Sequence, residues 1–561
     1  MPKKILTFFN REFNGINEAA LLLGGFAFLS QLLGLIRDRT LAGVIGAGPV
    51  LDTYYAAFRV PDFLYVSIAS LASVTVLLPF LMSKINSDED GKKAKLFLNN
   101  VFSAYMIFMV VICLIIAILM PYIAPYIAPG FSSDQLISLV LTSRIMLLSP
   151  IFIGLSNLIG TVTQLFKNFF IFSLSPIFYN LGILFGIIYF YPIFGVYGLA
   201  FGVILGAIMH LVIQIPIVIH HGLFPKITLK INWKEIFNVM KLSLPRTLAL
   251  SCNSIAFIVL IAMASTLKDG SISLFTFSFN LQSVPVGIIG ISYSVAAFPI
   301  LVKSFSMKEM DKFVDHIIGA AKQIIFWTLP VIALIIILRA QIIRVILGSG
   351  TFSWADTRLT AAAVALFVIS LASQSLVLLF VRGYYAASKT KKPLIVNAFS
   401  SFMVVIFAYI ILGIFRYYPN TLNIVESILR VTNVPGTIML ALPLAYALGS
   451  LLNFFLIWIL FNKDFLGSKK SMLSRTFFES LLGAITMGLF AYISLNFFSK
   501  IFDIDTFWEI LAQGLFSGII GIIFGILVLL LFKNQELLSI IKVLSHKLSS
   551  NHIVVPEQTE L

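Results

Sequence analysis

Charged residues are scarce in this sequence. Asp, Glu, Lys and Arg together make up 11% of its 561 residues, and 59% are hydrophobic, whereas about a quarter of a typical soluble domain is charged. This deficit excludes a soluble protein with a solvated surface. Apolar stretches of about 18–20 residues, each long enough to cross ~30 Å of hydrocarbon, recur along the chain instead. The composition therefore predicts an all-α polytopic membrane protein.

Residues for enzyme chemistry are also few. The two cysteines, Cys113 and Cys252, both lie in apolar stretches, where free cysteine is a small buried hydrophobe. The sequence has no phosphate-binding glycine loop and no HExxH motif. We therefore expect no enzymatic activity, no metal site and no cofactor. The net charge of +15 comes from Lys and Arg in short loops, which is typical of orientation signals and lipid contact rather than nucleic-acid binding.

Hydropathy predicts about fourteen membrane spans. Loops after even-numbered spans are rich in Lys, and loops after odd-numbered spans are poor in Lys and Arg, so the positive-inside rule places both termini in the cytoplasm. The predicted spans cover residues 18–46, 51–82, 97–125, 135–162, 168–192, 195–221, 238–266, 271–302, 314–338, 356–386, 393–415, 436–462, 475–499 and 508–532.

A weak internal repeat relates the two halves of the chain. Pro176 and Asn180 have the same spacing as Pro393 and Asn397, at an offset near 220 residues. Six spans per copy would preserve orientation, as in parallel-repeat transporters. We predict two six-helix lobes around a central cavity, followed by two further helices and a tail. The expected boundaries are a cytoplasmic segment 1–17, an N-lobe 18–221, a C-lobe 222–462, spans 13 and 14 in 463–532, and a cytoplasmic tail 533–561.

A run of charge interrupts the first predicted span at Arg37, Asp38 and Arg39. Each ionisable group at membrane depth costs roughly 2.5–3.5 kcal/mol on insertion scales, so such groups usually face a polar cavity. At 100° per residue the three side chains cannot share one direction. We expect an Arg37–Asp38 pair facing the cavity, with Arg39 at an interface or a helix end. A buried pair that only fixes packing is the alternative.

Further polar residues follow in the second, seventh and eighth predicted spans. Asp52 and Arg59 are two helical turns apart, although Asp52 could instead be the N-cap of its helix. Arg59 precedes Pro61, where the freed backbone favours a kink. Arg246 is the candidate second-lobe cation, with a boundary position as its alternative. The uncharged candidates for the cavity are Gln31, Tyr65, Asn280, Gln282 and Ser283.

Several of these motifs together resemble the MurJ (MviN) family of bacterial lipid II flippases. The resemblance rests on Gly34-Leu35-Ile36-Arg37-Asp38, on Gly46-Ala47-Gly48 with Asp52, on Phe58-Arg59-Val60-Pro61, on Gly350-Thr351-Phe352 with Asp356 and Thr360, and on Arg382-Gly383-Tyr384-Tyr385-Ala386 with Lys392-Pro393 and Asn397. It covers nearly the whole chain, and the N-terminal motif is the most specific part.

The resemblance implies a multidrug/oligosaccharidyl-lipid/polysaccharide exporter fold in the bacterial inner membrane, with spans 13 and 14 forming a groove for the lipid tail. It implies transport of undecaprenyl-pyrophosphate-linked disaccharide-pentapeptide (lipid II) from the inner to the outer leaflet. In that family cavity arginines bind the pyrophosphate. Arg37 matches one such position, Asp38 and Asp52 match acidic neighbours, and Arg59 falls where a basic residue is common.

The chain also departs from the family pattern. Tyr65 and Asn280 stand where the family usually has arginine, Ser283 replaces an acidic residue, and Gln31 stands where some members have arginine. Either Arg39, Arg59 and Arg246 supply the missing charge, or the head group of the lipid differs.

Three other functions therefore stay open: a flippase for another polyprenyl-linked glycan of the O-antigen or capsule type, a cation-coupled antiporter of the same fold, and a membrane scaffold that uses the basic stretch from Lys533 to Lys547. For the flippase we expect membrane lipids as surroundings and cell-wall synthesis proteins as possible partners. Membrane potential or a monovalent cation is the expected source of energy.

Overall fold

The computed structural model describes residues 16–68, 74–86, 92–466, 472–502 and 506–549. Within these ranges the chain forms helices and turns and no β-strand. The prediction of an all-α membrane protein is confirmed. Residues 1–15 of the predicted N-terminal segment 1–17 lie outside the described residues. The predicted tail lies outside them from residue 550 on.

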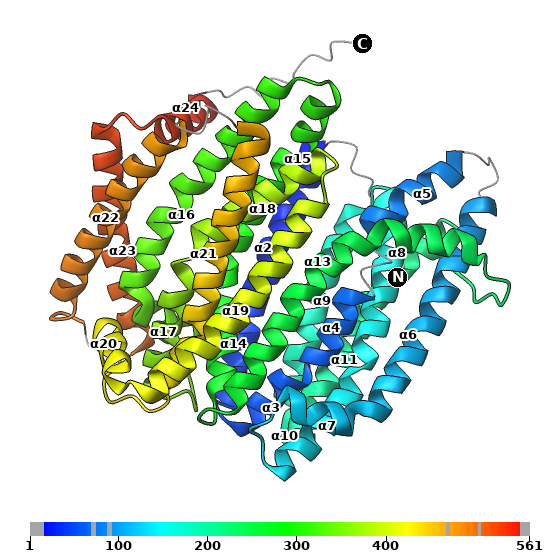
Figure 1. The fold of residues 1–561 in the computed structure, drawn as a ribbon, viewed down its shortest axis with the longest axis horizontal. Coiled ribbons are helices and arrows are strands. Elements are labelled where there is room, and N and C mark those ends of the chain that lie inside the picture. Colours follow the sequence, from blue (N-terminus) through cyan, green and yellow to red (C-terminus); the bar gives the residue numbers. More distant parts are fainter. Residues whose placement is uncertain (1–15, 69–73, 87–91, 467–471, 503–505, 550–561) are drawn as a thin grey trace. The chain divides into compact units, whose positions relative to one another are not determined.

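The helices follow one another along the chain with short connections (Figure 1). In order they are α2 (Ile16–Val44), α3 (Pro49–Ala57), α4 (Arg59–Ser67), α5 (Val74–Asn86), α6 (Lys92–Ile127), α7 (Ser133–Met146), α8 (Leu148–Leu165), α9 (Phe169–Phe185), η2 (Gly186–Phe190), α10 (Tyr191–Phe194), α11 (Val196–Val212), α12 (Ile215–His220), α13 (Trp233–Ser265), α14 (Ser271–Pro285), η3 (Val286–Ile291), α15 (Ser292–Ser306), α16 (Met310–Leu347), α17 (Trp354–Val368), α18 (Leu371–Ala386), α19 (Lys391–Tyr417), α20 (Pro419–Leu429), η4 (Thr437–Leu440), α21 (Ala441–Phe461), η5 (Asn462–Leu466), α22 (Met472–Phe498), α23 (Phe507–Leu531) and α24 (Gln535–Ser549).

Ten helical stretches in the described part of the chain are long and apolar enough to cross a membrane, and an eleventh is the pair α17 and α18, bent by 43°. These eleven correspond to the predicted spans 3–6 and 8–14. Predicted spans 1 and 7 are occupied by the continuous helices α2, of 29 residues, and α13, of 33 residues. The count of fourteen spans is not confirmed.

The predicted second span, 51–82, is not one helix. It consists of α3, α4 and α5, and α3 ends at Ala57 with Phe58 between it and α4. Pro61 has no N–H to donate to the Ala57 carbonyl, so the helical ladder fails there. The buried Ser143 hydroxyl donates to that carbonyl at 3.5 Å instead. The interruption at Phe58 lies three residues before Pro61, where the sequence predicts a kink.

The contacts divide the chain into two compact units. Unit 1 comprises residues 1–284, 346–367 and 389–453, and unit 2 comprises 285–345, 368–388 and 454–561. The two units interleave along the sequence, whereas the predicted lobes follow chain order. The lobe boundaries at 221 and 462 therefore stay predictions.

Unit 1 contains a close helix pair formed by α9 with η2 and α11. A Cβ placed on Gly186 would lie 2.4 Å from the Cα of Gly202, and one on Gly182 would lie 2.3 Å from the Cα of Gly206. Glycines spaced four residues apart let membrane helices approach through their backbones, which is the main source of packing energy where no water is displaced. This pair holds α9 firmly, and α9 carries part of the candidate site.

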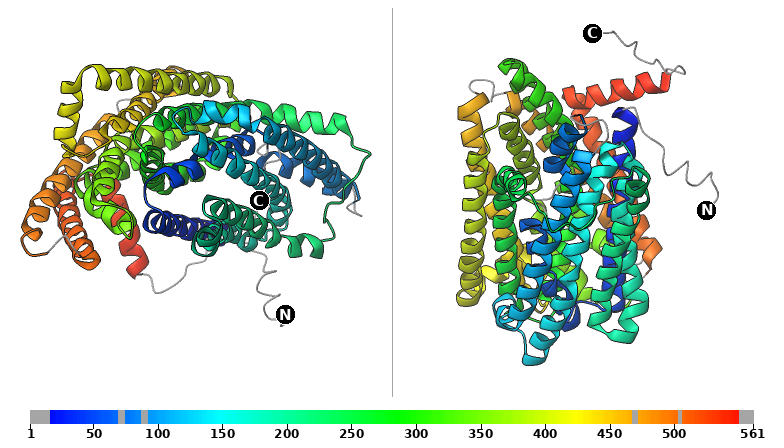
Figure 2. Two further views of the ribbon diagram at one scale, coloured as in Figure 1. Left: turned by 90° about the horizontal axis from the view of Figure 1, so that it is seen from below. Right: turned by 90° about the vertical axis from the view of Figure 1, so that its right-hand side faces the viewer.

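Unit 2 has an equivalent pair in α22 and α23, which run side by side (Figure 1). Gly521 and Gly525 of α23 receive Met487 of α22. The last helix, α24, lies across the end of these two helices (Figure 2). It is attached by the Thr476 hydroxyl, which donates to Glu536 at 3.1 Å.

We predict that Gly186→Ala lowers the thermal stability of the purified protein. The added methyl group meets backbone atoms of α11 that cannot move aside, and overpacking of this kind costs about 1–3 kcal/mol. The melting temperature in detergent, monitored by fluorescence-detected size-exclusion chromatography, measures the effect. Gly413→Ala is the matched control because nothing lies within 4 Å of its Cβ position. Equal melting temperatures for the two variants would show that the close packing is not stabilising.

Candidate functional site

Arg37 and Asp38 form an ion pair on α2, inside unit 1. The Arg37 Nε and Nη2 atoms donate to Oδ1 of Asp38 at 2.9 and 2.8 Å. Two amides from other helices complete the arrangement: Arg37 Nη1 donates to Oδ1 of Asn180 on α9 at 3.2 Å, and Asn280 Nδ2 of α14 donates to Oδ2 of Asp38 at 3.0 Å. We call these four residues the Arg37 network.

The Arg37 network leaves part of the guanidinium available. An arginine has five N–H donors, and three of those of Arg37 are used by Asp38 and Asn180. The Asp38 side chain is 2% exposed and the Arg37 side chain is 23% exposed. The acid is therefore held inside, while the base presents its remaining donors at an accessible edge. The expected pairing of Arg37 with Asp38 is present.

Asn280 has a definite task in this structure. Its amide satisfies the second oxygen of a buried carboxylate, and an unpaired buried acceptor would be costly. The side chain of Asn180 is fixed in turn, because its Nδ2 donates to the Pro176 carbonyl at 3.1 Å. The sequence repeat pointed to Asn180 and Pro176, but hydropathy alone gave no reason to place them beside Arg37.

The other predicted cations lie in different surroundings. Arg39 Nη1 donates at 3.4 Å to the carbonyl of Ile346 in the last turn of α16, where a cation is favourable for the helix dipole. Arg59 Nε donates to the Tyr55 carbonyl at 3.0 Å, and its guanidinium lies 4.9 Å from the centre of the Phe257 ring. Arg246 lies in α13, but its side chain is outside the described residues.

Asp52 does not cap its own helix. Gly48 occupies the N-cap position of α3 and makes no side-chain capping bond. Asp52 instead caps α14: its Oδ2 accepts from the Gly270 N–H at 2.7 Å, and its Oδ1 accepts from the Ser273 N–H and hydroxyl at 2.7 and 2.5 Å. The alternative role, N-cap of its own helix, was wrong because the first N–H groups of α14, more than 200 residues away in the sequence, approach this buried carboxylate.

A second set of contacts lies at the C-terminal end of α2. The Thr351 N–H donates to the Gly43 carbonyl at 3.0 Å, and its hydroxyl donates to the carbonyl of Ala42 at 3.2 Å. Gly350, at φ +55°, passes so close to Gly43 that a Cβ would lie 2.1 Å from the Gly43 oxygen. Only glycine fits this position. We call Gly43, Asp52, Gly270, Ser273 and Thr351 the loop cluster; all five belong to unit 1.

The uncharged predicted residues are distributed differently. Gln282 is buried, and the Ser283 side chain is turned back to donate to the Asn280 carbonyl at 2.6 Å. Gln31 of α2 is half-buried, and its Oε1 has no hydrogen-bond partner among the described residues. Tyr65 is half-buried, and its hydroxyl accepts from Asn157 Nδ2 at 3.0 Å.

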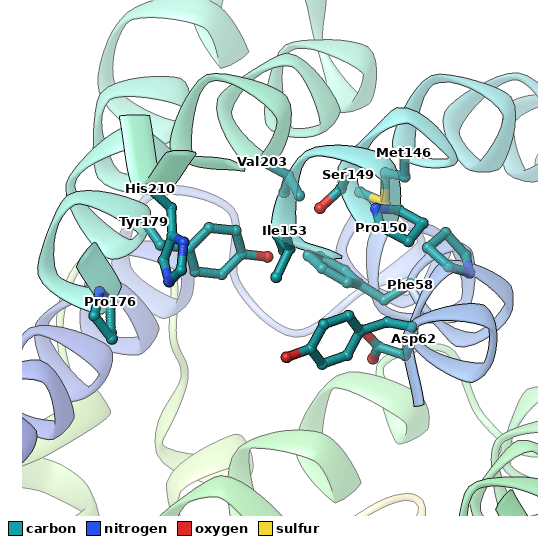
Figure 3. Close-up of a pocket in the computed structure, with 12 residues that line it drawn as sticks. Phe58, Asp62, Met146, Ser149, Pro150, Ile153, Pro176, Tyr179, Val203 and His210 are labelled. Carbon is teal, nitrogen blue, oxygen red and sulfur yellow. The ribbon is translucent and has the colours of Figure 1, made fainter. Parts of the chain in front are cut away.

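A cavity of about 280 Å³ opens beside Tyr65 within unit 1 (Figure 3). The Tyr179 ring extends into it from α9, and Phe58, Asp62 and Ser149 face the ring from the opposite side. Its lining consists of Phe58, Pro61, Asp62, Tyr65, Met146, Ser149, Pro150, Ile153, Pro176, Tyr179, Val203 and His210.

The imidazole of His210 is already engaged at the edge of this cavity. Its Nδ1 lies 2.7 Å from the Ser156 hydroxyl. Within the described ranges, no three His, Cys, Asp or Glu side chains come close enough together to hold a metal ion.

Comparison with protein families places most of this chain in one group. The family model described as lipid II flippase MurJ matches residues 41–513. A probable lipid II flippase MurJ of Buchnera aphidicola subsp. Acyrthosiphon pisum is 27% identical over 381 residues, which is 66% of this chain and 73% of the relative. The corresponding protein of Buchnera aphidicola subsp. Schizaphis graminum is 26% identical over 505 residues, 88% of this chain and 92% of the relative.

Solved structures show the same fold. A structure of lipid II flippase MurJ in an inward closed conformation superimposes with a TM-score of 0.71 at 23% identity, over 93% of this chain and all of that chain. An inward-facing multidrug resistance MATE transporter of the MOP superfamily superimposes with a TM-score of 0.62 at 17% identity, over 79% of this chain and 98% of that chain.

Proposed function

Because the chain belongs to the lipid II flippase MurJ family, we propose that it carries lipid II from the inner to the outer leaflet of the bacterial inner membrane. The observation that carries this proposal is the Arg37 network, a guanidinium with unused donors held at membrane depth by two amides and a carboxylate. Ionisable groups inside a membrane usually mark the path of a polar substrate or ion. The anionic pyrophosphate of a polyprenyl-linked head group meets that requirement.

The chemistry of binding follows from the geometry of Arg37. Arginine binds phosphate oxygens with forked, charge-assisted hydrogen bonds. Asp38 takes two donors and keeps the guanidinium in place, and the other donors can contact the pyrophosphate. Arg39 and Arg59 make their contacts with the Ile346 carbonyl and with Tyr55 and Phe257, so we assign the primary anion contact to Arg37 and give them no direct role.

We further propose that the loop cluster is the outer closure of an alternating-access cycle. The loops after odd-numbered spans are poor in Lys and Arg, and on the positive-inside rule they face away from the cytoplasm, with both termini inside. Asp52 and Thr351 join segments of the first two predicted spans to the starts of predicted spans 8 and 10. Breaking these bonds would open that end while the lipid tail stays in the membrane.

A flippase for another polyprenyl-linked glycan is the second candidate. The sequence resemblance favours it, because Tyr65 and Asn280 stand where that resemblance leads us to expect arginine. Each is engaged with a neutral or acidic partner here. Lysis on depletion indicates lipid II, and loss of surface polysaccharide alone indicates the other glycan. For the lipid II flippase we also propose contacts with cell-wall synthesis proteins. The likeness to MATE transporters concerns the fold alone.

We predict that Arg37→Ala abolishes growth of a strain depleted of its own lipid II flippase. The loss removes the only guanidinium of the Arg37 network, and Arg37→Lys should also be impaired because lysine cannot make a forked contact. Complementation at matched membrane levels is the measurement. Arg358→Ala is the control, since Arg358 is half-buried outside the Arg37 network and donates to the Arg430 carbonyl. Full growth with Arg37→Ala would refute the assigned role.

We predict that a disulfide across the loop cluster stops transport. The Cβ of Ser349 lies 3.5 Å from the Cβ position of Gly43, which is within the range of natural disulfides. A Gly43→Cys/Ser349→Cys protein lacking Cys113 and Cys252 should lose function on oxidation and regain it on reduction. The two single-cysteine proteins are the controls. Transport by the cross-linked protein would show that this end need not open.

We also propose that membrane potential returns the empty cationic site to the cytoplasmic side. An inside-negative potential favours inward movement of one positive charge across the membrane by ~2.3 kcal/mol per 100 mV. Flipping by proteoliposomes should therefore slow when an ionophore collapses the potential. Replacing Na⁺ by K⁺ at constant potential separates this from coupling to a monovalent cation. A rate independent of potential contradicts the proposal.

A further inference from the structure

The cavity beside Tyr65 has a chemical character different from that of the Arg37 network. The rings of Phe58, Tyr65 and Tyr179 line it, together with the imidazole of His210 and the carboxylate of Asp62. Asp62 is an exposed residue, and its carboxylate makes no hydrogen bond or ion pair with another described side chain. A carboxylate repels an anion, so the cavity does not suit a phosphate. Aromatic faces and an acceptor-only group together suit a neutral, hydroxyl-rich ligand.

The polar groups of the cavity are prepared for a ligand. The Tyr65 hydroxyl accepts from Asn157 Nδ2 at 3.0 Å, so its position is fixed and its proton remains to be donated. The Tyr179 hydroxyl points into the space, and the Ser149 hydroxyl lies across from it (Figure 3). Donors and acceptors thus surround the cavity, while Phe58 and the proline rings provide apolar walls. A few fixed polar groups in a mostly apolar pocket are typical of small-molecule sites.

Helix α9 places this cavity next to the Arg37 network. Pro176 and Tyr179 line the cavity, and the next residue, Asn180, accepts from Arg37 at 3.2 Å. Asn180 is also bonded to the Pro176 carbonyl. One turn of α9 therefore contributes to both sites. A ligand whose anionic part contacts Arg37 would place the group directly attached to that part at the mouth of the cavity.

We propose that this cavity binds the first sugar ring of the lipid-linked head group, with Asp62 accepting from sugar hydroxyls and the Tyr65 and Tyr179 rings packing against the C–H faces of the sugar. The inference rests on the proposed function, in which the sugar is joined directly to the pyrophosphate. Aromatic faces make favourable contacts with apolar or weakly polarised groups, and hydroxyl-to-carboxylate hydrogen bonds are among the stronger neutral-donor contacts.

The size of the cavity limits what it can hold. Its volume of about 280 Å³ is near the lower end of small-molecule sites, roughly 300–1,000 Å³. It accommodates one ring and not the whole disaccharide-pentapeptide. Tyr65, which lines the cavity, is then a specificity-determining residue through its contact with the sugar.

Binding of three probes to the purified full chain tests this proposal. The probes are undecaprenyl pyrophosphate, undecaprenyl pyrophosphate carrying one N-acetylhexosamine, and lipid II. The wild-type protein should bind both sugar-bearing lipids at least tenfold more tightly than the sugar-free one. Asp62→Asn and Tyr179→Leu should each reduce that preference below threefold and leave binding of undecaprenyl pyrophosphate within twofold. Arg37→Lys should weaken all three probes together.

Asp134→Asn is the matched control, because Asp134 is an exposed acid in the first turn of α7, outside the cavity. Melting curves identify any variant that is misfolded, and Asp62→Asn changes one atom type only. The sugar proposal is overturned if the wild-type protein binds the sugar-bearing and sugar-free lipids equally well, or if the cavity variants weaken binding of all three probes equally. It is also overturned if Asp62→Asn changes only the dependence of probe binding on Na⁺. Tight binding of the one-sugar lipid with no binding of lipid II supports the sugar site and refutes lipid II as the substrate.

Discussion

The ion pair of Arg37 and Asp38 is the constraint on which the candidate site depends. Charges at membrane depth are expensive, and a pair alone does not satisfy all donors and acceptors of a guanidinium and a carboxylate. Asn180 and Asn280 supply further partners from α9 and α14, and two N–H donors of Arg37 remain unused. The pair therefore determines which helices must lie beside α2. The glycine contacts between α9 and α11 stabilise the same arrangement by holding α9 in place.

The sequence was sufficient for the class of fold and for the centre of the site. Long apolar stretches predict spanning helices from length alone, and charges within such a stretch stand out against an apolar background, as Arg37 and Asp38 do. Hydropathy did not reveal that span 2 is broken, because an average over 51–82 does not register the single N–H that Pro61 lacks. Pro61 was the signal for it in the sequence, and the structure shows the Ala57 carbonyl accepting from Ser143 instead.

The remaining parts of the site depend on contacts distant in sequence. Asp52 looked like an N-cap of its own helix, since a turn precedes it. Its actual partners, Gly270 and Ser273, are 218 and 221 residues away, and no local pattern specifies such a pairing. Tyr179 was missed because a tyrosine is common in a membrane helix, and only its approach to α4 across the cavity shows its role. Asp62 was missed although it is a charge inside a predicted span, and that charge was the signal that could have found it.

Helix α14 links the two ends of the candidate mechanism. Ser273 and Asn280 are seven residues apart, which is two helical turns, so they lie on one face of α14. Ser273 is bonded to Asp52 at the loop cluster, and Asn280 is bonded to Asp38 in the Arg37 network. On the proposed mechanism, an anion draws the Arg37 guanidinium away from Asp38 and leaves the Asp38 carboxylate without its cation. The hydrogen bond from Asn280 to Asp38, one of the two bonds that hold this face of α14, then changes in strength. Ligand binding and opening of the loop cluster then act on the same rigid helix, which is the physical requirement for coupling between the two sites.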